Sequence, residues 1–513
     1  MTQTAEKVKS RHDLRLDWLI DHPDELIKKR PFTRGGDPAS SLDSEGVEVG
    51  EFRTARLPDF KKNEVSQRQF IDEFDPARHK IHHDENVPSI TVKLKTGGYC
   101  ELEFKRMGIP IQKMICSKQV QHLCGNKTVF TLDCDDPTDA ETKDFATFKK
   151  YWKKRNMDGM RMKMVAIQKA FGDAGLLFYF DRKGRIKCRL LSYEDGYVLC
   201  PHNDDNGDRL LESVYYKIDG VEHIDSYSDE YCYHHVKDVK ADKGTQWRLS
   251  SITKHGFDEI PLVTKRGDVA WNAVQDEIEV FEVLYNVFIV IQKRHGWGVL
   301  YIKGKFSEKA KKIAGSVILN DASMNKDGDA KYLTPPTPEG MLETLKSIFE
   351  QIQMGSSTTF ILPKDISMGA DISGVAIQVA QSLDNEEARR GSTEWQNVIS
   401  KMTRLFLYGL GQEFVNTGKD LKAFTRLSNL EISAYIKPWS PRSDSEYNQM
   451  LSNLAGSGLI SYKTGIEKNT ESTPDEEKRL EIEGQKADKK AEKIAQQIQN
   501  QKTDIDNEET DNK

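Results

Sequence analysis

The sequence predicts an α+β protein built from more than one domain. At 513 residues, the chain is longer than the roughly 250–300 residues at which a single hydrophobic core stops growing. Residues 174–237 form a series of short alternating segments separated by turns, which is typical of β-strands. Residues 271–294 and 374–414 instead repeat apolar side chains at helical spacing. Strands and helices that are segregated along the chain are typical of the α+β class.

The N-terminal third begins with an arm, residues 1–65, that we expect to be partly flexible. It contains one helical segment, 12–29, followed by a Gly/Ser/Asp-rich stretch, 35–50. Helical spacing resumes near Gln67, and residues 90–94 and 100–104 alternate around a Lys-Thr-Gly-Gly turn, which predicts a β-hairpin.

A mixed segment follows. Residues 107–124 and 143–171 carry helical periodicity, with a polar run between them. The strands that we expect next are 174–180, 186–191, 196–199, 211–217, 223–228 and 231–237. This part of the chain should therefore form a β-rich lobe.

The central helix, 271–294, is apolar on two stripes. Val274, Ile278, Phe281, Tyr285 and Phe288 form one stripe, and Val280, Leu284, Val287 and Ile291 form the other. Apolar side chains that cover so much of a helix surface predict burial on more than one side of the helix. A small α/β insert should follow, with strand 297–302, helix 307–319 and strand 330–333.

A second amphipathic helix, 338–354, precedes a Gly/Ser/Thr loop, 355–373. A very long helical pattern then covers 374–414, and Gly391 predicts a kink within it. A strand, 430–436, and two shorter helices, 443–455 and 461–468, lead to a charged tail.

The charge of the chain is unevenly distributed. The formal net charge is −6, and residues 471–513 hold 13 acidic and 8 basic residues, a balance of −5 that leaves about −1 for the rest. Tight, static DNA binding normally depends on clustered Lys and Arg that neutralise phosphates. A nearly neutral body argues against such binding but is compatible with loose passage of DNA.

The cysteine content and the absence of targeting segments indicate where the protein is made. Seven cysteines are scattered without a CxxC pair, so we expect reduced thiols. The first 30 residues lack the apolar core of a signal peptide. The strongest apolar run, 278–291, is interrupted by Glu279, Glu282 and Asn286 and is shorter than the ~20 residues of a membrane span. The sequence thus predicts synthesis in the cytoplasm and no membrane segment.

No enzyme motif is present in the sequence. GxxxxGK[ST], HExxH, GxSxG and GxGxxG are all missing. Residues 321–329 alternate like a calcium loop, but Lys326 and Tyr332 replace the required Gly and Glu. We therefore expect no catalytic residue, no metal and no cofactor. The alternative is a metal-dependent nucleic-acid-processing enzyme that uses the Asp/His-rich segments 82–84 and 202–208.

The order of elements, together with several local patterns, resembles the portal proteins of tailed bacteriophages, which are head-tail connectors. RMGIPIQKMIC at 106–116 resembles the helix that opens the wing of these proteins, and Asn126 stands where members often have proline. IPLV at 260–263, ISGVAI at 372–377, GLISYKTG at 458–465 and PDEE at 474–477 are also similar to recurrent stretches of the family. Another head or tail structural protein remains a second alternative.

The resemblance implies a portal-type subunit with a β-rich and helical wing, a two-helix stem, a small α/β clip, a long kinked helix and a helical C-terminal crown. The implied segments are an arm (1–65), wing (66–268), stem helices (269–295 and 338–354), clip (296–337), tunnel loop (355–373), kinked wing helix and strand (374–437), crown (438–483) and flexible charged tail (484–513).

The implied function is a ring, twelve subunits by analogy, at one vertex of the virion capsid. Double-stranded DNA would pass through it without sequence specificity during packaging and ejection. The implied partners are the terminase, the major capsid protein and a head-completion or adaptor protein.

Two sets of residues are the candidates for these roles. Phe281, Phe288 and Ile291 cover more of the helix surface than one partner helix can bury, so we expect them at a subunit interface. Lys364, the one basic residue of the tunnel loop, is a candidate for contact with DNA in the channel. Lys293 and Arg294 are further candidates, although cations at a helix C-terminus also complement the helix dipole.

Overall fold

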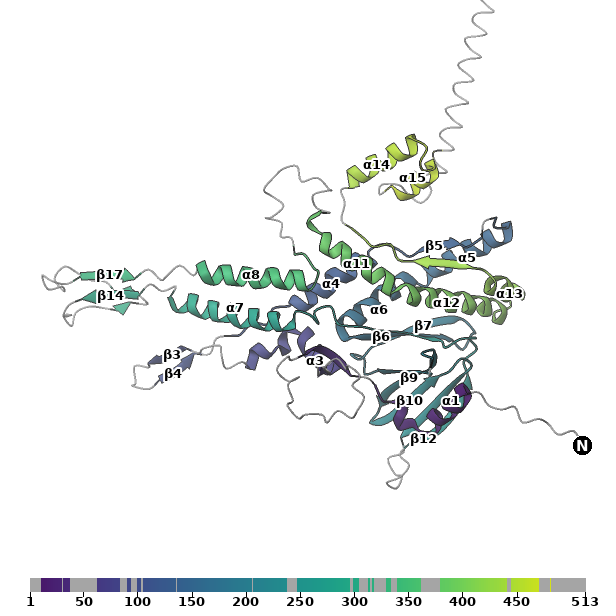
Figure 1. Cartoon of the computed structure of the whole chain (residues 1–513), viewed down its shortest axis with the longest axis horizontal. Coiled ribbons are helices and arrows are strands. Elements are labelled where there is room, and N and C mark those ends of the chain that lie inside the picture. The colour runs from purple at the N-terminus through teal and green to yellow at the C-terminus, as the bar shows by residue number, and fades with distance from the viewer. Residues whose placement is uncertain are drawn as a thin grey trace, which may run out of the picture. The chain divides into compact units, whose positions relative to one another are not determined.

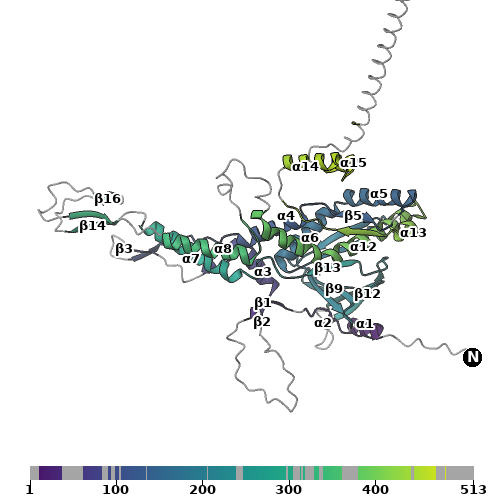
Figure 2. The same cartoon turned by 45° about the horizontal axis from the view of Figure 1, so that its top comes forward.

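A computed structural model describes residues 11–29, 31–36, 62–83, 90–93, 99–102, 105–134, 136–204, 206–237, 247–295, 299–303, 312–313, 316–317, 329–333, 339–360, 379–440, 444–469 and 480. The chain divides into two compact units. Unit 1 comprises Met1–Phe360 and Leu383–Trp439, and unit 2 comprises Ile361–Ser382 and Ser440–Lys513. Helices and strands both contribute to unit 1, which confirms a mixed α+β protein (Figures 1 and 2).

The core of unit 1 is a helical layer packed on a small sheet. Its helices are α4 (Ile111–Cys124), α5 (Asp139–Lys154), α6 (Met157–Phe171) and α12 (Gln396–Asn416). The rings of Phe148, Trp152 and Phe406 are all buried and lie 5.3–5.9 Å apart. Aromatic rings at such distances add to the energy of burial. The contacts join α5 to α12, which are more than 200 residues apart in the chain.

Two antiparallel sheets lie on one side of this layer, with the smaller sheet between the helices and the larger sheet (Figure 1). The first has the order β13-β6-β7, and the second has the order β12-β11-β10-β9-β8. Their bounds are β6 Asp173–Phe180, β7 Ile186–Leu191, β8 Val198–Asn203, β9 Arg209–Ile218, β10 Val221–Tyr227, β11 Tyr231–Lys237, β12 Trp247–Lys254 and β13 Leu262–Arg266. The expected β-rich lobe is therefore confirmed, and consecutive strands are neighbours in the larger sheet.

The N-terminal helices cover one face of the larger sheet. Leu19 of α1 (Arg11–Asp21) and Leu26 of α2 (Pro23–Leu26) are buried with Leu211, Ile224 and Trp247. The single helix expected over 12–29 is interrupted at His22, because a proline at 23 disfavours the helical conformation of the residue before it.

The remaining small elements of unit 1 are short pairs of strands and short helices. The pairs are β1 (Phe32–Gly36) with β2 (Lys62–Val65), β3 (Ile90–Lys93) with β4 (Tyr99–Leu102), and β5 (Val129–Leu132) with β18 (Ile432–Tyr435). The hairpin expected over 90–104 is thus confirmed. The helices are α3 (Gln67–Phe74), η1 (Pro76–Arg78), η2 (Lys80–His83) and α13 (Ala423–Ser428).

The helix expected over 143–171 is two helices, α5 and α6. Asn156 separates them in the left-handed conformation, with φ at 52°. Asn tolerates this conformation better than most residues. Thr138 and Glu141 form a capping box at the start of α5, which fixes the beginning of this helix.

The expected insert contains strands rather than a helix at 307–319. β14 (Val299–Lys303) pairs with β17 (Asp329–Leu333), whereas β15 (Lys312–Ile313) and β16 (Ser316–Val317) occupy the segment where the helix was expected. The helix prediction was wrong there. Ile313 and Val317 are β-branched, which disfavours helix and favours strand.

Gly391, where a kink was expected, lies inside α11 (Ser382–Glu394), and the helix is interrupted one turn later, at Trp395, between α11 and α12. Gly391 has a packing role. A side chain there would begin 3.2 Å from Leu123 of α4, so glycine allows α11 to approach α4 closely. Trp395 is 1% exposed, and its burial places the interruption of the helix inside the core.

In unit 2, α14 (Asp444–Gly456) and α15 (Tyr462–Lys468) confirm the two short helices expected near the C-terminus. Ser461 caps α15 by accepting a hydrogen bond from the Thr464 amide at 3.1 Å. The charged tail, 484–513, lies outside the described residues. Among the described helices, none is long and apolar enough to cross a membrane.

The aromatic core supports a first prediction. Trp152→Ala should lower the free energy of unfolding by about 3–5 kcal/mol, because it opens a cavity between Phe130 and Phe406. Trp18→Ala is the matched control, since Trp18 is 49% exposed, and it should change stability by about 0.5 kcal/mol or less. Urea denaturation followed by circular dichroism measures both. Equal effects of the two substitutions would contradict the assignment of Trp152 to the core.

Candidate functional site

The candidate site is built on two antiparallel helices, α7 (Gln275–His295) and α8 (Glu339–Gly355). Val274, just before α7, lies against Gly355 at the end of α8, and the ring of Phe281 lies 5.8 Å from that of Phe349. Ile278 and Ile352 are fully buried in the same region. A side chain at Gly355 would begin 2.5 Å from Val274, so this end of the pair requires glycine. The first apolar stripe of α7 is therefore occupied by α8.

A second face of α7 carries polar side chains that bind an earlier part of the chain. Glu282 is 3% exposed, and its Oε1 accepts a hydrogen bond from the Ile109 amide at 2.6 Å and lies 2.6 Å from His79 Nδ1. His79 Nε2 lies 2.7 Å from the carbonyl oxygen of Glu73, which only accepts. Nε2 must therefore donate to this carbonyl oxygen, and Nδ1 faces Glu282.

Asn286, one turn further along α7, extends this contact. Its side chain accepts a hydrogen bond from the Met107 amide and donates one to the Met107 carbonyl oxygen, both at 2.9 Å. Ile81 and Val290 are buried together beside it, with Val283 packed against them. We call Glu282, Asn286 and His79 the polar anchor. It fixes residues 79–83 and 107–109 to the second face of α7.

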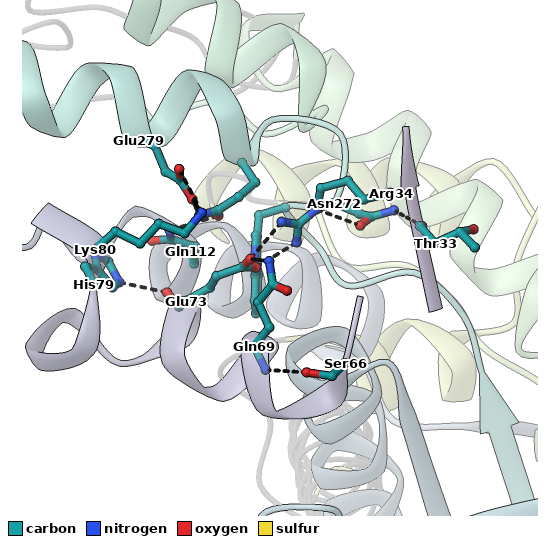
Figure 3. Close-up of polar contacts among 12 residues, drawn as sticks. Thr33, Arg34, Ser66, Gln69, Glu73, His79, Lys80, Gln112, Asn272 and Glu279 are labelled. Carbon is teal, nitrogen blue, oxygen red and sulfur yellow. Dashed lines mark hydrogen bonds and ion pairs between the residues drawn. The ribbon is translucent and has the colours of Figure 1, made fainter. Parts of the chain in front are cut away.

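Glu73 of α3 connects the polar anchor to the rest of unit 1 (Figure 3). Arg34 binds both of its carboxylate oxygens at 2.7 Å, and Trp271 Nε1 and Gln69 Nε2 donate to it at 2.9 and 3.0 Å. A buried carboxylate with four donors is well compensated for its lost hydration. Because Trp271 lies just before α7, this cluster fixes the start of the helix.

A cleft of about 600 Å³ opens beside these groups. Its lining carries charges of both signs, from Arg68, Asp72, Arg78, Lys80 and Glu279 among others. Lys80 and Glu279 form an ion pair across it at 2.8 Å (Figure 3). Among the residues that the structure describes, no group of three or more His, Cys, Asp or Glu side chains could hold a metal ion. The mixed charges of the cleft do not single out a ligand.

The third face of α7 carries the second stripe expected from the sequence. Val280 on this stripe is 51% exposed, whereas Leu284, Val287 and Ile291 are half-buried. On α8, Leu342 and Met354 are 41% and 63% exposed. The helix pair thus presents apolar side chains to its surroundings, which often marks a surface for association.

The structure places the predicted interface residues on different faces of α7. Phe281 belongs to the face that packs on α8, through Phe349, and Phe288 lies two turns further along the same stripe. Ile291 is half-buried and belongs, with Val280, to the second stripe of α7, which we call the open stripe. Lys293 and Arg294 lie in the last turn of α7, but their side chains lie outside the described part of the chain.

Lys364 lies outside the described residues, in the segment 361–378. The residues before and after this segment are held together. Asp384 of α11 accepts a hydrogen bond from the Thr359 amide at 3.2 Å, and Gln119 of α4 donates to the Ser356 carbonyl oxygen at 2.8 Å. Burial raises the pKa of Asp384 and lowers the pKa of the neighbouring His122. Residues 356–359, at the start of the expected tunnel loop, are thus fixed to α4 and α11.

The polar anchor supports a second prediction. Glu282→Ala should destabilise the junction of α7 with residues 107–109 by about 3 kcal/mol or more, because it leaves the buried His79 Nδ1 and the Ile109 amide without a partner. Hydrogen exchange of the Ile109 amide should accelerate by about a hundredfold. Glu279→Ala is the control, since its partner Lys80 is 69% exposed, and it should have little effect. Unchanged exchange in Glu282→Ala would show that the anchor does not hold the junction.

Comparison with known proteins identifies the family. A family model described as phage portal protein, SPP1 Gp6-like, matches residues 101–503, well over half of the chain. No curated protein matches the sequence. Among solved structures, the chain is similar to one described as the neck of an empty GTA particle computed with C6 symmetry, with 11% identity, a TM-score of 0.36, and coverage of 69% of this chain and 88% of that chain. The chain therefore belongs to the SPP1 Gp6-like family of phage portal proteins, which are structural components of the virion and not enzymes.

Proposed function

We propose that this portal protein forms the ring through which double-stranded DNA enters and leaves the capsid, and that the open stripe of α7 closes this ring. Membership of the family implies an oligomeric ring at a capsid vertex. The observation that carries the proposal is the distribution of the three faces of α7. One face packs on α8 and one holds the polar anchor, so the third is left for another subunit.

A contact of this kind suits a ring. The open stripe of one subunit would meet the exposed side chains of α8 on the next subunit. Because the two surfaces differ, the contact is heterologous, and it repeats around an axis until the ring closes. At about 1.5 Å per residue, α7 offers roughly 30 Å of length for such contacts. Twelve subunits is the number that resemblance to the family suggests.

The other segments receive their roles by the same resemblance. We propose that residues 66–268 and 374–437 form the wing, which meets the major capsid protein. Residues 296–337 would form the clip, which docks the terminase during packaging and a head-completion or adaptor protein afterwards. Residues 438–483 would form the crown.

Passage of DNA is supported by the charge of the chain. Outside the residues 471–513, the formal charge is close to zero, so the body as a whole would not hold a duplex by counterion release. Lys293 and Arg294 near the end of α7, and Lys364 between α8 and α11, are the proposed contacts with phosphate. Their attraction would be screened by salt, which suits sliding rather than clamping.

A third prediction tests the open stripe. Val280→Asp should prevent ring formation, because a carboxylate buried at a subunit contact without a partner costs several kcal/mol. The subunit itself should stay folded, since Val280 is half-exposed in it. Ile218→Asp is the matched control, because Ile218 is 53% exposed on β9, and its rings should be intact. Mass photometry and negative-stain microscopy count the rings. Full rings from Val280→Asp would remove this stripe from the interface.

A fourth prediction tests Lys364. Lys364→Glu particles should assemble normally but package or retain less DNA, because the substitution replaces attraction to phosphate with repulsion. The deficit should change with ionic strength, since such contacts are screened. DNA content per particle, measured across a range of salt, checks this, and Lys254→Glu on β12, a lysine that is 63% exposed and outside α7 and α8, serves as a charge-matched control. Normal DNA content at every salt concentration would leave Lys364 without a role in passage.

A further inference from the structure

Helices α5 and α13 lie at the end of unit 1 away from α7 and α8 (Figure 1), and exposed cations cluster on and beside them. Four of these cations lie in the last two turns of α5, and the others lie in the β6–β7 turn and in the segment between α12 and α13. We call them the basic cluster: Lys149, Lys150, Lys153, Lys154, Arg182, Lys183, Lys419 and Lys422, all of them exposed.

Buried contacts bring these three segments together. Glu413 of α12 binds Arg155 at 2.8 Å and accepts a hydrogen bond from the Ile186 amide of β7 at 3.1 Å. Gly184 in the β6–β7 turn packs directly against Asn416. Each of these contacts links parts of the chain more than 200 residues apart. The basic cluster is therefore a fixed feature of the fold.

Lys154 and Lys419 share one aromatic ring. Their Nζ atoms lie 5.6 and 5.9 Å from the centre of the Tyr151 ring, and Lys419 also lies 5.6 Å from the ring of Phe414. Two like charges are thus held side by side on an apolar support, which leaves their ammonium groups directed to solvent.

The nearby carboxylates are already paired with arginines outside the basic cluster. Arg426 binds both Asp144 and Asp420, at 2.9 and 2.8 Å, and Arg185 binds Asp181 at 2.8 Å. By contrast, no ion pair joins any member of the basic cluster to a carboxylate within the described residues. The positive charge of this surface is therefore not compensated locally, although the body of the chain is nearly neutral.

We propose that the basic cluster binds the phosphate backbone of double-stranded DNA, without sequence specificity, on a surface separate from the channel. Lysines gathered on one surface are the electrostatic footprint of nucleic-acid binding, whereas lysine is depleted at protein–protein interfaces. Spacing supports this, because Lys149 and Lys153, and likewise Lys150 and Lys154, are one helical turn apart on the same side of α5. The proposal does not depend on passage of DNA through a ring.

The test uses the assembled full-length protein and a covalently closed circular duplex. A closed circle cannot thread a closed ring, so any binding must occur on an outer surface. Binding is measured at several salt concentrations for the wild type and for a variant in which Lys149, Lys150, Lys153 and Lys154 are all Gln. The variant should bind at least about tenfold more weakly. The slope of log K against log[salt] should fall by about one for each lysine that contacts phosphate.

A charge-matched control changes four exposed lysines elsewhere, Lys28, Lys113, Lys217 and Lys254, to Gln. This control should keep wild-type affinity and slope. An equal loss in the control would show that net charge rather than the cluster attracts DNA, and unchanged binding by the α5 variant would overturn the proposal.

An acidic protein is the alternative occupant, because Leu421, beside Lys419 and Lys422, is 77% exposed and could anchor such a partner. Leu421→Ser separates the two occupants. DNA binding that is unaffected by Leu421→Ser supports the proposal. If the wild-type ring does not bind the circular duplex even at low salt, while acidic polypeptide binds and depends on Leu421, the surface belongs to a protein partner.

Discussion

Helix α7 must satisfy two different neighbours within one subunit, and the arrangement of unit 1 around it follows from this constraint. Its first apolar stripe is buried against α8, so the chain has to return antiparallel after β14 and β17. Its polar face needs partners for Glu282 and Asn286, which residues 79–83 and 107–109 provide. Within a single subunit, two faces of α7 are thereby in contact with other elements, and the third, apolar face is left. In a protein whose family forms rings, that remainder is the natural surface for a neighbour.

The sequence predicted the stripes of α7 but not the polar anchor, and the reason is physical. Apolar periodicity is a local property that can be read along one helix. Glu282 and Asn286 could be read only as interruptions that exclude a membrane span. Their partners His79 and Met107 lie 203 and 179 residues away in the chain, and no local signal connects them. The buried pairing becomes visible only when the tertiary structure brings these residues together.

At Gly391, tertiary packing outweighed local propensity. Glycine is a poor helix former, which predicted a kink at Gly391, yet this glycine stays helical because its missing side chain lets α11 pack against Leu123. The interruption falls at Trp395, a good candidate for a helix interior by pattern alone. At Asn156, by contrast, a residue that tolerates the left-handed conformation does end one helix and begin the next. The conformational preference of the residue therefore determined the helix break at Asn156 but not at Gly391, where packing required a continuous helix.

Net charge is a poor guide to the charge of an individual surface of this protein. The net charge of the whole chain does not show that arginines and lysines have different roles at the surface of the basic cluster. Arg155, Arg185 and Arg426 each form ion pairs beside the basic cluster. The planar guanidinium group, with several donors, is suited to such pairing. The lysines around them stay unpaired and exposed. Three arginines offset most of the charge of the four nearby carboxylates, so a nearly neutral chain still presents a positively charged surface, and this sign is the one that attracts phosphate.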